Sequence, residues 1–365
     1  MGRESWQNLD LSLLVATVAL VVFGIAAGYS ATINSPGLES LTYRQIVYAI
    51  IGFILMIILA FVDYRFLENI YRPLYVFVLG MLAIILIIGQ IRFGAQRWID
   101  TQLFPIQPSE ISKILIIIVL AKYLTDNFEM MGHFRHVVFS LLFIMPPIVL
   151  IYFQPALGTS ISILAVWLGM IFAAGARVWH LGVLGLGVVG LLPFLWMVMR
   201  DYMRQRVYTF INPMSDPLGA GYNVIQARIA IGNGGLWGAG FTHGSQSQLH
   251  FLRVRHTDFV FSVIGEEMGF VGAIVLFALF AFVLWRVLRA ASISRDSFGY
   301  LLCYGVAAIL FFQSAVNIGM NLGLMPITGI PLPFISSGGS SLITFLVALG
   351  LVQSVVVHHK RLGFE

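Results

Sequence analysis

Long apolar runs alternate with short polar connections along almost the whole chain. The hydrocarbon core of a bilayer is about 30 Å thick, so a helix that crosses it needs roughly 20 apolar residues. Stretches that satisfy this requirement recur ten times, and the pattern therefore predicts ten transmembrane helices. The predicted spans are residues 11–30, 46–62, 73–91, 106–123, 137–153, 159–175, 181–199, 259–285, 299–323 and 341–357.

The composition agrees with a protein that folds in lipid. Of the 365 residues, 59% are hydrophobic and 10% are charged, whereas a soluble domain has about 45–50% apolar and about 25% charged residues. These values exclude a soluble enzyme, a nucleic-acid-binding module and a disordered chain. We predict an all-α polytopic membrane protein in which residues 1–365 form a single domain. Its single cysteine, Cys303, excludes an intramolecular disulfide.

The distribution of Lys and Arg predicts the orientation, because short cytoplasmic connections carry an excess of both. With a cytoplasmic N-terminus, the short outside connections hold only Arg44, Arg92 and Arg97. The inside set is much larger: Arg3, Arg65, Arg72, Lys122, Arg135, Arg177, Arg286, Arg289, Arg295, Lys360 and Arg361. We therefore expect both termini in the cytoplasm.

The connection between the seventh and eighth predicted helices, about residues 200–257, is far longer than the others and lies outside in this orientation. Loops longer than about 15 residues without structure of their own are usually functional or disordered. This one contains many glycines together with large apolar residues such as Trp237. We expect a partly structured extracytoplasmic loop; a passive cap over the helices is the alternative.

An acid and a base stand within the fourth predicted helix. Glu110 and Lys113 are three residues apart and therefore share one face, where they can pair. Ionisable residues at membrane depth are costly and are candidates for function. Two interpretations remain open: a structural ion pair that packs helices together, or a cationic lining for an anionic group of a substrate.

The start of the eighth predicted helix carries Asp258, directly after His256 and Thr257. Either Thr257 or Asp258 can act simply as a helix cap. Alternatively, a partly desolvated Asp258 beside the arginine-rich loop can act as a general base. Glu266 and Glu267 follow about two turns deeper, and at least one of these adjacent acids must meet a partner or water.

Polar residues also follow the ninth predicted helix, where Gln313, Asn317 and Asn321 recur every four residues. Hydrogen bonds between packed helices are the favoured explanation for this stripe. The next segment, residues 326–340, contains three prolines and three glycines and cannot be a continuous helix. Irregular backbone at the membrane must be buried in protein or line a wet cavity. We expect it on the outer face, with the long loop.

Cofactor motifs are missing from the sequence: it has no metal-ligand spacing, Walker loop, dinucleotide fingerprint or nucleophile elbow. No cofactor is therefore predicted with certainty, and assistance by a divalent cation stays open.

Several of these segments together resemble one family, the SEDS proteins (shape, elongation, division and sporulation), and within it the elongation branch. The resemblance spans nearly the whole chain. It rests on residues 107–113 (Gln-Pro-Ser-Glu-Ile-Ser-Lys), 212–222, Gln226, 231–240, 244–248, 255–259 (Arg-His-Thr-Asp-Phe), 266–269 (Glu-Glu-Met-Gly) and 331–340.

The resemblance implies a peptidoglycan glycosyltransferase of the bacterial inner membrane that polymerises lipid II during cell-wall elongation and rod-shape maintenance. Asp258 occupies the essential aspartate position of the family, and its implied role is general base in an inverting displacement. Candidates for binding substrate or pyrophosphate are Lys113, Glu110, Arg206, Arg228, Arg97, His256, Ser336 and Ser337. Residues expected to shape the outer cavity are Glu266, Glu267, Gln154, Ala156 and Asn317.

The chain departs from the family pattern in two places. The turn 154–159 normally carries Asp in its third position, where this chain has Ala156. Any role of that carboxylate is absent here, and reduced activity is one expected consequence. The family usually has Pro-Glu before the Arg-His-Thr-Asp motif, whereas this chain has Arg253 and Val254. The approach to Asp258 is therefore more basic.

Two other functions remain as alternatives, a lipid II flippase and a membrane scaffold for a class B penicillin-binding protein. A transporter favours inverted repeats and broken helices at the midplane, and neither is recognisable in the sequence. The expected partners are lipid II, a class B penicillin-binding protein and other membrane proteins of the elongation complex, with no nucleic acid.

Overall fold

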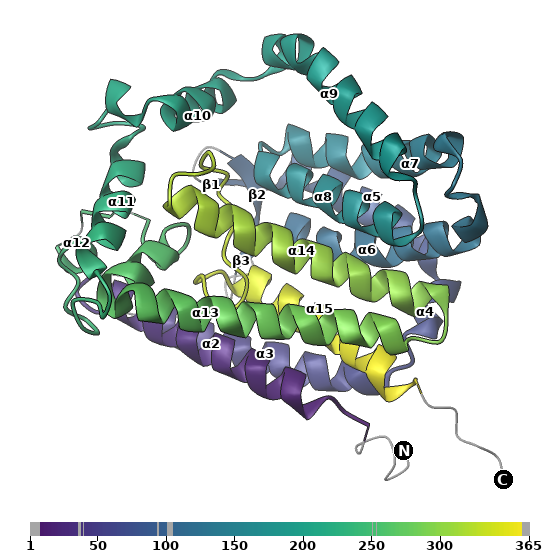
Figure 1. Ribbon diagram of the computed structural model, residues 1–365, viewed down its shortest axis with the longest axis horizontal. Helices are drawn as coiled ribbons and strands as arrows, with labels where there is room; N and C mark the ends of the chain where they lie inside the picture. Colours follow the sequence, from purple (N-terminus) through teal and green to yellow (C-terminus); the bar gives the residue numbers. More distant parts are fainter. Residues whose placement is uncertain are drawn as a thin grey trace.

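The apolar runs form helices because every backbone polar group must be satisfied inside its own segment in lipid. The computed structural model describes residues 8–35, 38, 40–92, 95–100, 105–249, 251–252 and 254–359. A long helix occupies each of the ten predicted stretches (Figure 1). These helices are α2 (Leu11–Thr32), α3 (Ser40–Phe61), α5 (Tyr71–Ile88), α6 (Pro108–Asp126), α7 (Phe134–Phe153), α8 (Leu157–Ala173), α9 (Val178–Val198), α13 (Val260–Ile293), α14 (Ser297–Asn321) and α15 (Gly339–Val357).

Within the described residues, six of these helices are both long and apolar enough to cross a membrane: α2, α3, α7, α13, α14 and α15. Apolar stretches within α5, α8 and α9 are shorter. The remaining helix, α6, is less apolar because it carries Glu110, Lys113, Lys122 and Asp126. The chain is thus a multi-pass membrane protein.

Short elements fill the connections. They are α4 (Arg65–Asn69), η1 (Phe128–Met130), α10 (Asp201–Ile211), η2 (Pro213–Ser215), α11 (Tyr222–Gly234) and α12 (Ser245–Gln248). The long connection between α9 and α13 therefore contains the helices α10, η2, α11 and α12. Between η2 and α11, the carboxylate of Asp216 accepts hydrogen bonds from the backbone of Gly219 and Ala220 and closes an exposed turn.

The all-α prediction is confirmed, and one short sheet lies in the connection between α5 and α6. Three short antiparallel strands, β1 (Gln90–Arg92), β2 (Ala95–Asp100) and β3 (Pro105–Ile106), join α5 to α6 in the order β1-β2-β3. The register pairs Gln90 with Trp98 and Ile99 with Ile106. Backbone groups just beyond the helix ends are satisfied by this ladder, which apolar periodicity cannot reveal.

Of the six candidate spans, α14 and α15 are the most buried. Small residues allow close contact between α3 and α15: a Cβ atom added to Gly350 would lie 2.8 Å from the carbonyl oxygen of Met56. At the opposite end from α12, Asp10 beside the start of α2 exchanges two hydrogen bonds with Gln353 of α15. Its carboxylate also pairs with Arg286 of α13 at 2.6 Å.

The helix α13 contains a break at Gly269, whose φ of 63° is left-handed. The sequence predicts a continuous span here, because the surrounding run has no proline and no charge between Met268 and Trp285. The backbone groups freed at this break are taken up by residues 235–240 of the long loop, as described below.

Candidate active site

The segment between α14 and α15, residues 322–338, is the irregular turn that the prolines predict, and it organises the candidate site. The hydroxyl of Ser336 accepts the backbone N–H of Leu332 at 2.8 Å and donates to the carbonyl of Thr257 at 2.6 Å. The backbone N–H of Ser337 donates to the carbonyl of His256 at 2.9 Å. These bonds tie the turn to the residues that precede α13.

The half-buried Asp258 lies between this turn and α14. Its backbone carbonyl accepts hydrogen bonds from the amides of Asn317 at 3.2 Å and Asn321 at 2.9 Å. The N-cap residue of α13 is Phe259, with no side-chain cap bond in the described structure. Instead, the side-chain oxygen of Asn321 accepts a hydrogen bond from the backbone N–H of Ser262 at 3.2 Å. The N-cap position of α13 is therefore Phe259 rather than Thr257 or Asp258, and Asn321 of α14 supplies an acceptor for the first turn.

The guanidinium of Arg206, from α10, reaches the same turn. It is half-buried, and its Nη1 donates to the carbonyl of Thr328 at 3.0 Å. The next residue, Gly329, has a φ of 70°. A Cβ atom added to it would lie 3.9 Å from Asp258 Oδ2 and 4.0 Å from Arg206 Nη2. A carboxylate and a guanidinium thus face one glycine, although about 50 residues separate them in the sequence.

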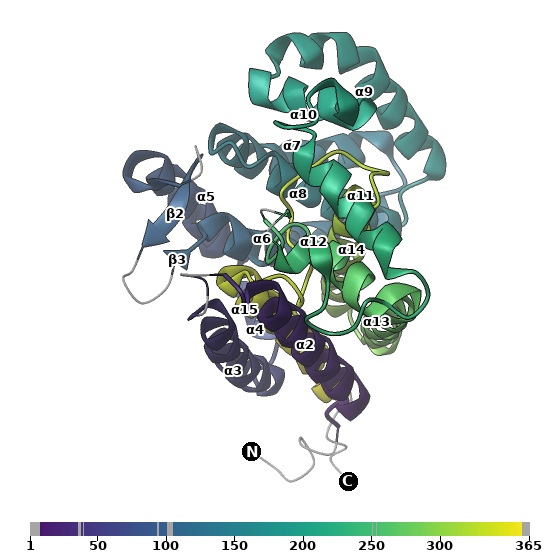
Figure 2. The same cartoon turned by 90° about the vertical axis from the view of Figure 1, so that its left-hand side faces the viewer.

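The second loop arginine, Arg228 of α11, contacts the beginning of the same segment. Its Nη2 donates to the carbonyl of Gly323 at 3.0 Å, and the side chain is exposed. Figure 2 shows α10, α11 and α12 at the end of the molecule where α13 begins and α14 ends. The long loop and the turn 322–338 are therefore on the same face, as the sequence predicts.

The imidazole of His256 is half-buried, and its Nδ1 finds no hydrogen-bond partner among the described residues. Burial, together with the nearby Arg255 guanidinium, lowers the pKa of His256 below its ordinary value. A neutral imidazole therefore stands two residues from Asp258. Arg255 itself is buried, and it donates to the carbonyl of Ala31 at 2.6 Å and to the hydroxyl of Ser35.

The buried pair of α6 lies apart from these groups. Lys113 Nζ contacts Glu110 Oε2 at 2.8 Å, and the two side chains are 0% and 5% exposed. The ammonium also lies 5.4 Å from the ring centroid of Phe345 in α15. This geometry favours the structural ion pair over a lining that meets substrate directly. The start of α6 still touches the site, since the N–H of Gln107 donates to the hydroxyl of Ser340.

Both acids of α13 have partners, which the sequence alone could not assign. Glu266 accepts hydrogen bonds from the backbone of Gln246 at 2.7 Å and Ser247 at 3.1 Å, at the N-terminus of α12. Glu267 accepts from Ser30 of α2 at 2.6 Å and from the hydroxyl of Ser247 at 3.3 Å. The two residues anchor the loop rather than face Asp258.

The departure at position 156 falls at a helix start beside the site. Ala156 is the buried N-cap residue of α8 and offers no side-chain cap. Two residues later, a Cβ atom added to Gly158 would lie 2.8 Å from the carbonyl oxygen of Thr328. The preceding Gln154 is buried and donates to the carbonyl of Leu82 at 2.9 Å. The turn 154–159 therefore supports the segment that Arg206 contacts.

Arg97 is the predicted candidate that cannot be placed: its backbone belongs to β2, but its side chain lies outside the described structure. No group of three or more His, Cys, Asp or Glu gathers among the described residues. Near Gly329 the described acid is Asp258, beside a guanidinium, and this donor set does not fit a divalent cation.

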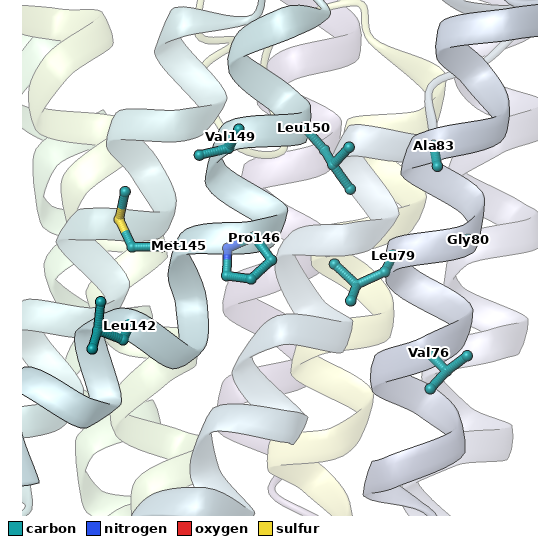
Figure 3. A pocket seen from close by; sticks show the side chains of 9 residues that line it. All are labelled: Val76, Leu79, Gly80, Ala83, Leu142, Met145, Pro146, Val149 and Leu150. Carbon is teal, nitrogen blue, oxygen red and sulfur yellow. The ribbon is translucent and has the colours of Figure 1, made fainter.

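A groove of about 780 Å³ lies elsewhere, between α5 and α7 (Figure 3). Its lining is apolar and includes Gly80, Leu142 and Pro146. None of the predicted site residues lines this groove, so it is not the candidate active site.

Sequence reasoning missed three features of the site: the buried Arg255, the cap supplied by Asn321 and the position of Gly329. The four-residue spacing of Gln313, Asn317 and Asn321 was the available signal for the second. No signal connects Arg206 to Asp258, because turn geometry decides their proximity.

Comparison with known proteins places these features in context. Residues 8–361 match the FtsW/RodA/SpoVE family model, described as cell cycle protein. The chain is 38% identical over 357 residues to the peptidoglycan glycosyltransferase MrdB of Escherichia coli K12, covering 98% of this chain and 95% of that protein. It is 36% identical over 355 residues to the stage V sporulation protein E of Bacillus subtilis, covering 95% and 96%.

Solved structures agree. One chain from a peptidoglycan synthase complex that coordinates polymerization and crosslinking superposes with a TM-score of 0.81 and 34% identity, covering 95% of this chain and 97% of that one. The rod shape determining protein RodA of Thermus thermophilus superposes with a TM-score of 0.69 and 30% identity, covering 95% and 96%.

Proposed function

Because this chain belongs to the FtsW/RodA/SpoVE family of cell cycle proteins, we propose that it is a peptidoglycan glycosyltransferase that polymerises lipid II during cell-wall elongation, with Asp258 as the general base. The observation that carries the assignment of the base is the convergence of Asp258 and Arg206 on Gly329. The names of its relatives support the reaction class.

The proposed step is a direct displacement. A hydroxyl oxygen of the acceptor sugar attacks the anomeric carbon of the donor, and its proton passes to the carboxylate of Asp258. The bond between the anomeric carbon and the pyrophosphate oxygen breaks, and its electron pair leaves with the lipid pyrophosphate. Each bond formed in this step is matched by a bond broken, and no covalent enzyme intermediate is needed.

Two arginines, Arg206 and Arg228, stabilise the negative charge that develops on the leaving group. Arg206 has Nη1 fixed to the carbonyl of Thr328, while Nη2 faces Gly329 beside Asp258. A guanidinium held in place before reaction stabilises a phosphate at no reorganisation cost. Arg228, exposed at Gly323, is suited to the more distant phosphate. Ser336, Ser337 and Asn317 hold the backbone around Asp258 and therefore position it.

The proposed topology places all ten long helices across the membrane, both termini in the cytoplasm and the site on the outer face. The arrangement of α2, α13 and α15 supports it, because Asp10, Arg286 and Gln353 meet at the end opposite α12. A class B penicillin-binding protein is the proposed partner. Its support is the likeness to a chain of a peptidoglycan synthase complex.

A flippase is the less favoured alternative. Transporters of that kind use paired discontinuous helices whose free backbone groups bind the cargo. In the described structure α13 has a break at Gly269, but the carbonyls of Glu266 and Glu267 there accept hydrogen bonds from Ala239 and Gly240. These carbonyls are engaged by the chain itself.

The test follows the polymerisation of purified lipid II on gels, with and without the class B penicillin-binding protein. Asp258→Asn is expected to abolish polymer. The matched control is Asp201→Asn on α10, because the Asp201 side chain is fully exposed and its ion pair with Arg204 spans 3.7 Å. Polymer made by the Asp258→Asn protein at the control rate contradicts the assignment. Lipid II translocation in vesicles without polymer favours the flippase.

A further inference from the structure

The break in α13 at Gly269 binds one turn of the long loop, residues 235–240, through backbone hydrogen bonds in both directions. The N–H groups of Ala239 and Gly240 donate to the carbonyls of Glu266 and Glu267 at 2.9 and 3.0 Å. In return, the N–H groups of Phe270 and Val271 donate to the carbonyls of Gly235 and Leu236 at 2.9 and 3.1 Å. The turn 235–240 therefore substitutes for the missing turn of the helix.

Glycines make this contact very close. A Cβ atom added to Gly238 would lie 2.2 Å from the carbonyl oxygen of Glu267, and one added to Gly269 would lie 2.4 Å from the nitrogen of Gly238. Such distances leave no room for side chains. The turn 235–240 is thus packed tightly against α13.

The side chains of the turn nevertheless point outward. Leu236 is 65% exposed and Trp237 is 79% exposed. The adjoining surface of α13 is also apolar and exposed at Phe270 and Ile274. Exposed apolar side chains therefore lie both on the turn and on the part of α13 that follows the break.

The depth of the turn follows from the length of α13. Residues from Met268 to Trp285 carry no charge, and at 1.5 Å per residue they extend over about 27 Å, close to the thickness of the hydrocarbon core. Trp285 lies beneath the guanidinium groups of Arg286 and Arg289, at the end of α13 that the proposed topology places at the cytoplasmic limit. Gly269 and the turn then lie at the opposite limit, where tryptophan is enriched at membrane interfaces.

We propose that the Leu236–Trp237 turn is a membrane anchor of the long loop, with its two side chains inserted among the lipids of the outer leaflet. The loop is then attached to the bilayer at a point rigidly joined to Glu266 and Glu267. The ligand is the hydrocarbon and interfacial region of phospholipid, and the proposal does not depend on the glycosyl transfer reaction.

The experiment measures the depth of position 237 directly. Cys303 is the only cysteine in the sequence, so Cys303→Ala gives a background for single-site spin labelling. A label is placed through Trp237→Cys in nanodiscs of phosphatidylethanolamine and phosphatidylglycerol, and its collisions with oxygen and with a water-soluble nickel chelate are compared. The references are Phe277→Cys, within the span and 42% exposed, and Leu218→Cys, in the loop and 81% exposed.

An oxygen-to-nickel ratio several-fold above that of position 218 and near that of position 277 supports the anchor. A ratio equal to that of position 218 overturns it, because the turn is then in water. Poor access to both reagents also overturns it, because protein then covers the turn. A second measurement uses the conservative variant Trp237→Phe. This variant is expected to lose a component of the tryptophan fluorescence that brominated lipid quenches, and unchanged quenching contradicts the proposal.

Discussion

Removing the amide of Asn321 tests how the site is held. In Asn321→Ala the N–H and hydroxyl of Ser262 lose their acceptor, and the carbonyl of Asp258 loses the closer of its two amide donors. The side chain is 0% exposed, so water does not replace these bonds readily. The backbone of Asp258 keeps only the 3.2 Å bond from Asn317 among those described.

The magnitude follows from the orphaned groups. A buried N–H left without an acceptor costs about 1–3 kcal/mol, and each lost bond contributes about 1 kcal/mol more. With the bonds of the Ser262 hydroxyl and the Asp258 carbonyl also lost, we expect Asn321→Ala to lower the free energy of unfolding by about 3–5 kcal/mol. A displacement of the proposed base, Asp258, by about 1 Å costs about 100-fold in rate, so the polymerisation rate at saturating lipid II should fall by about 10- to 100-fold.

The assay combines unfolding in SDS with initial rates of polymerisation. Gln313→Ala is the matched control, because Gln313 lies two turns away on the same face of α14, is buried, and makes a weak 3.5 Å bond to Ser162. It should lose some stability and keep its rate. If Asn321→Ala unfolds like wild type and polymerises at the wild-type rate, the cap from α14 does not position Asp258.

Three further outcomes are expected. Ala156→Asp should stabilise the protein by about 1 kcal/mol in SDS unfolding by capping α8; no gain means that the position does not accept a cap. The wild-type protein is expected to lose thermal stability below about pH 6.5, because the pKa of His256 is lowered in the folded protein and the unfolded chain takes up the proton more readily. His256→Gln should abolish this loss; an equal loss in both proteins contradicts the explanation. Gly238→Ala should destabilise by about 3 kcal/mol or more through its clash with Glu267, whereas Gly80→Ala, with open space around it, should change stability by less than about 1 kcal/mol.

Much of the helical framework could be predicted, because lipid requires long apolar runs and the sequence displays them directly. The ten helices lie where those runs lie. The same reasoning fails at Gly269: a glycine in an uncharged apolar run looks like any other helical position, and the left-handed φ depends on carbonyls supplied from residues 235 and 236.

The candidate site likewise has features that the sequence reveals and features that it does not. Asp258 stands out because acids are rare in this chain, and the amide stripe of α14 stands out through its spacing. The partner of Asp258 across Gly329 does not, because the approach of Arg206 depends on the path of the turn 322–338. Lys113 was conspicuous for its rarity, yet its geometry is that of a closed pair with Glu110. Scarcity identifies a residue as important without indicating which task it performs.

The attachment of Asp258 to α14 has a practical consequence for tagging. Since the carbonyl of Asp258 is bound by amides from α14, an epitope or fluorescent domain inserted into the exposed turn at Leu218 should leave the Asp258 carboxylate undisturbed. The turn closes locally through Asp216, so its ends remain near each other after insertion. Live imaging and affinity capture of a working protein can therefore use this exposed turn of the loop.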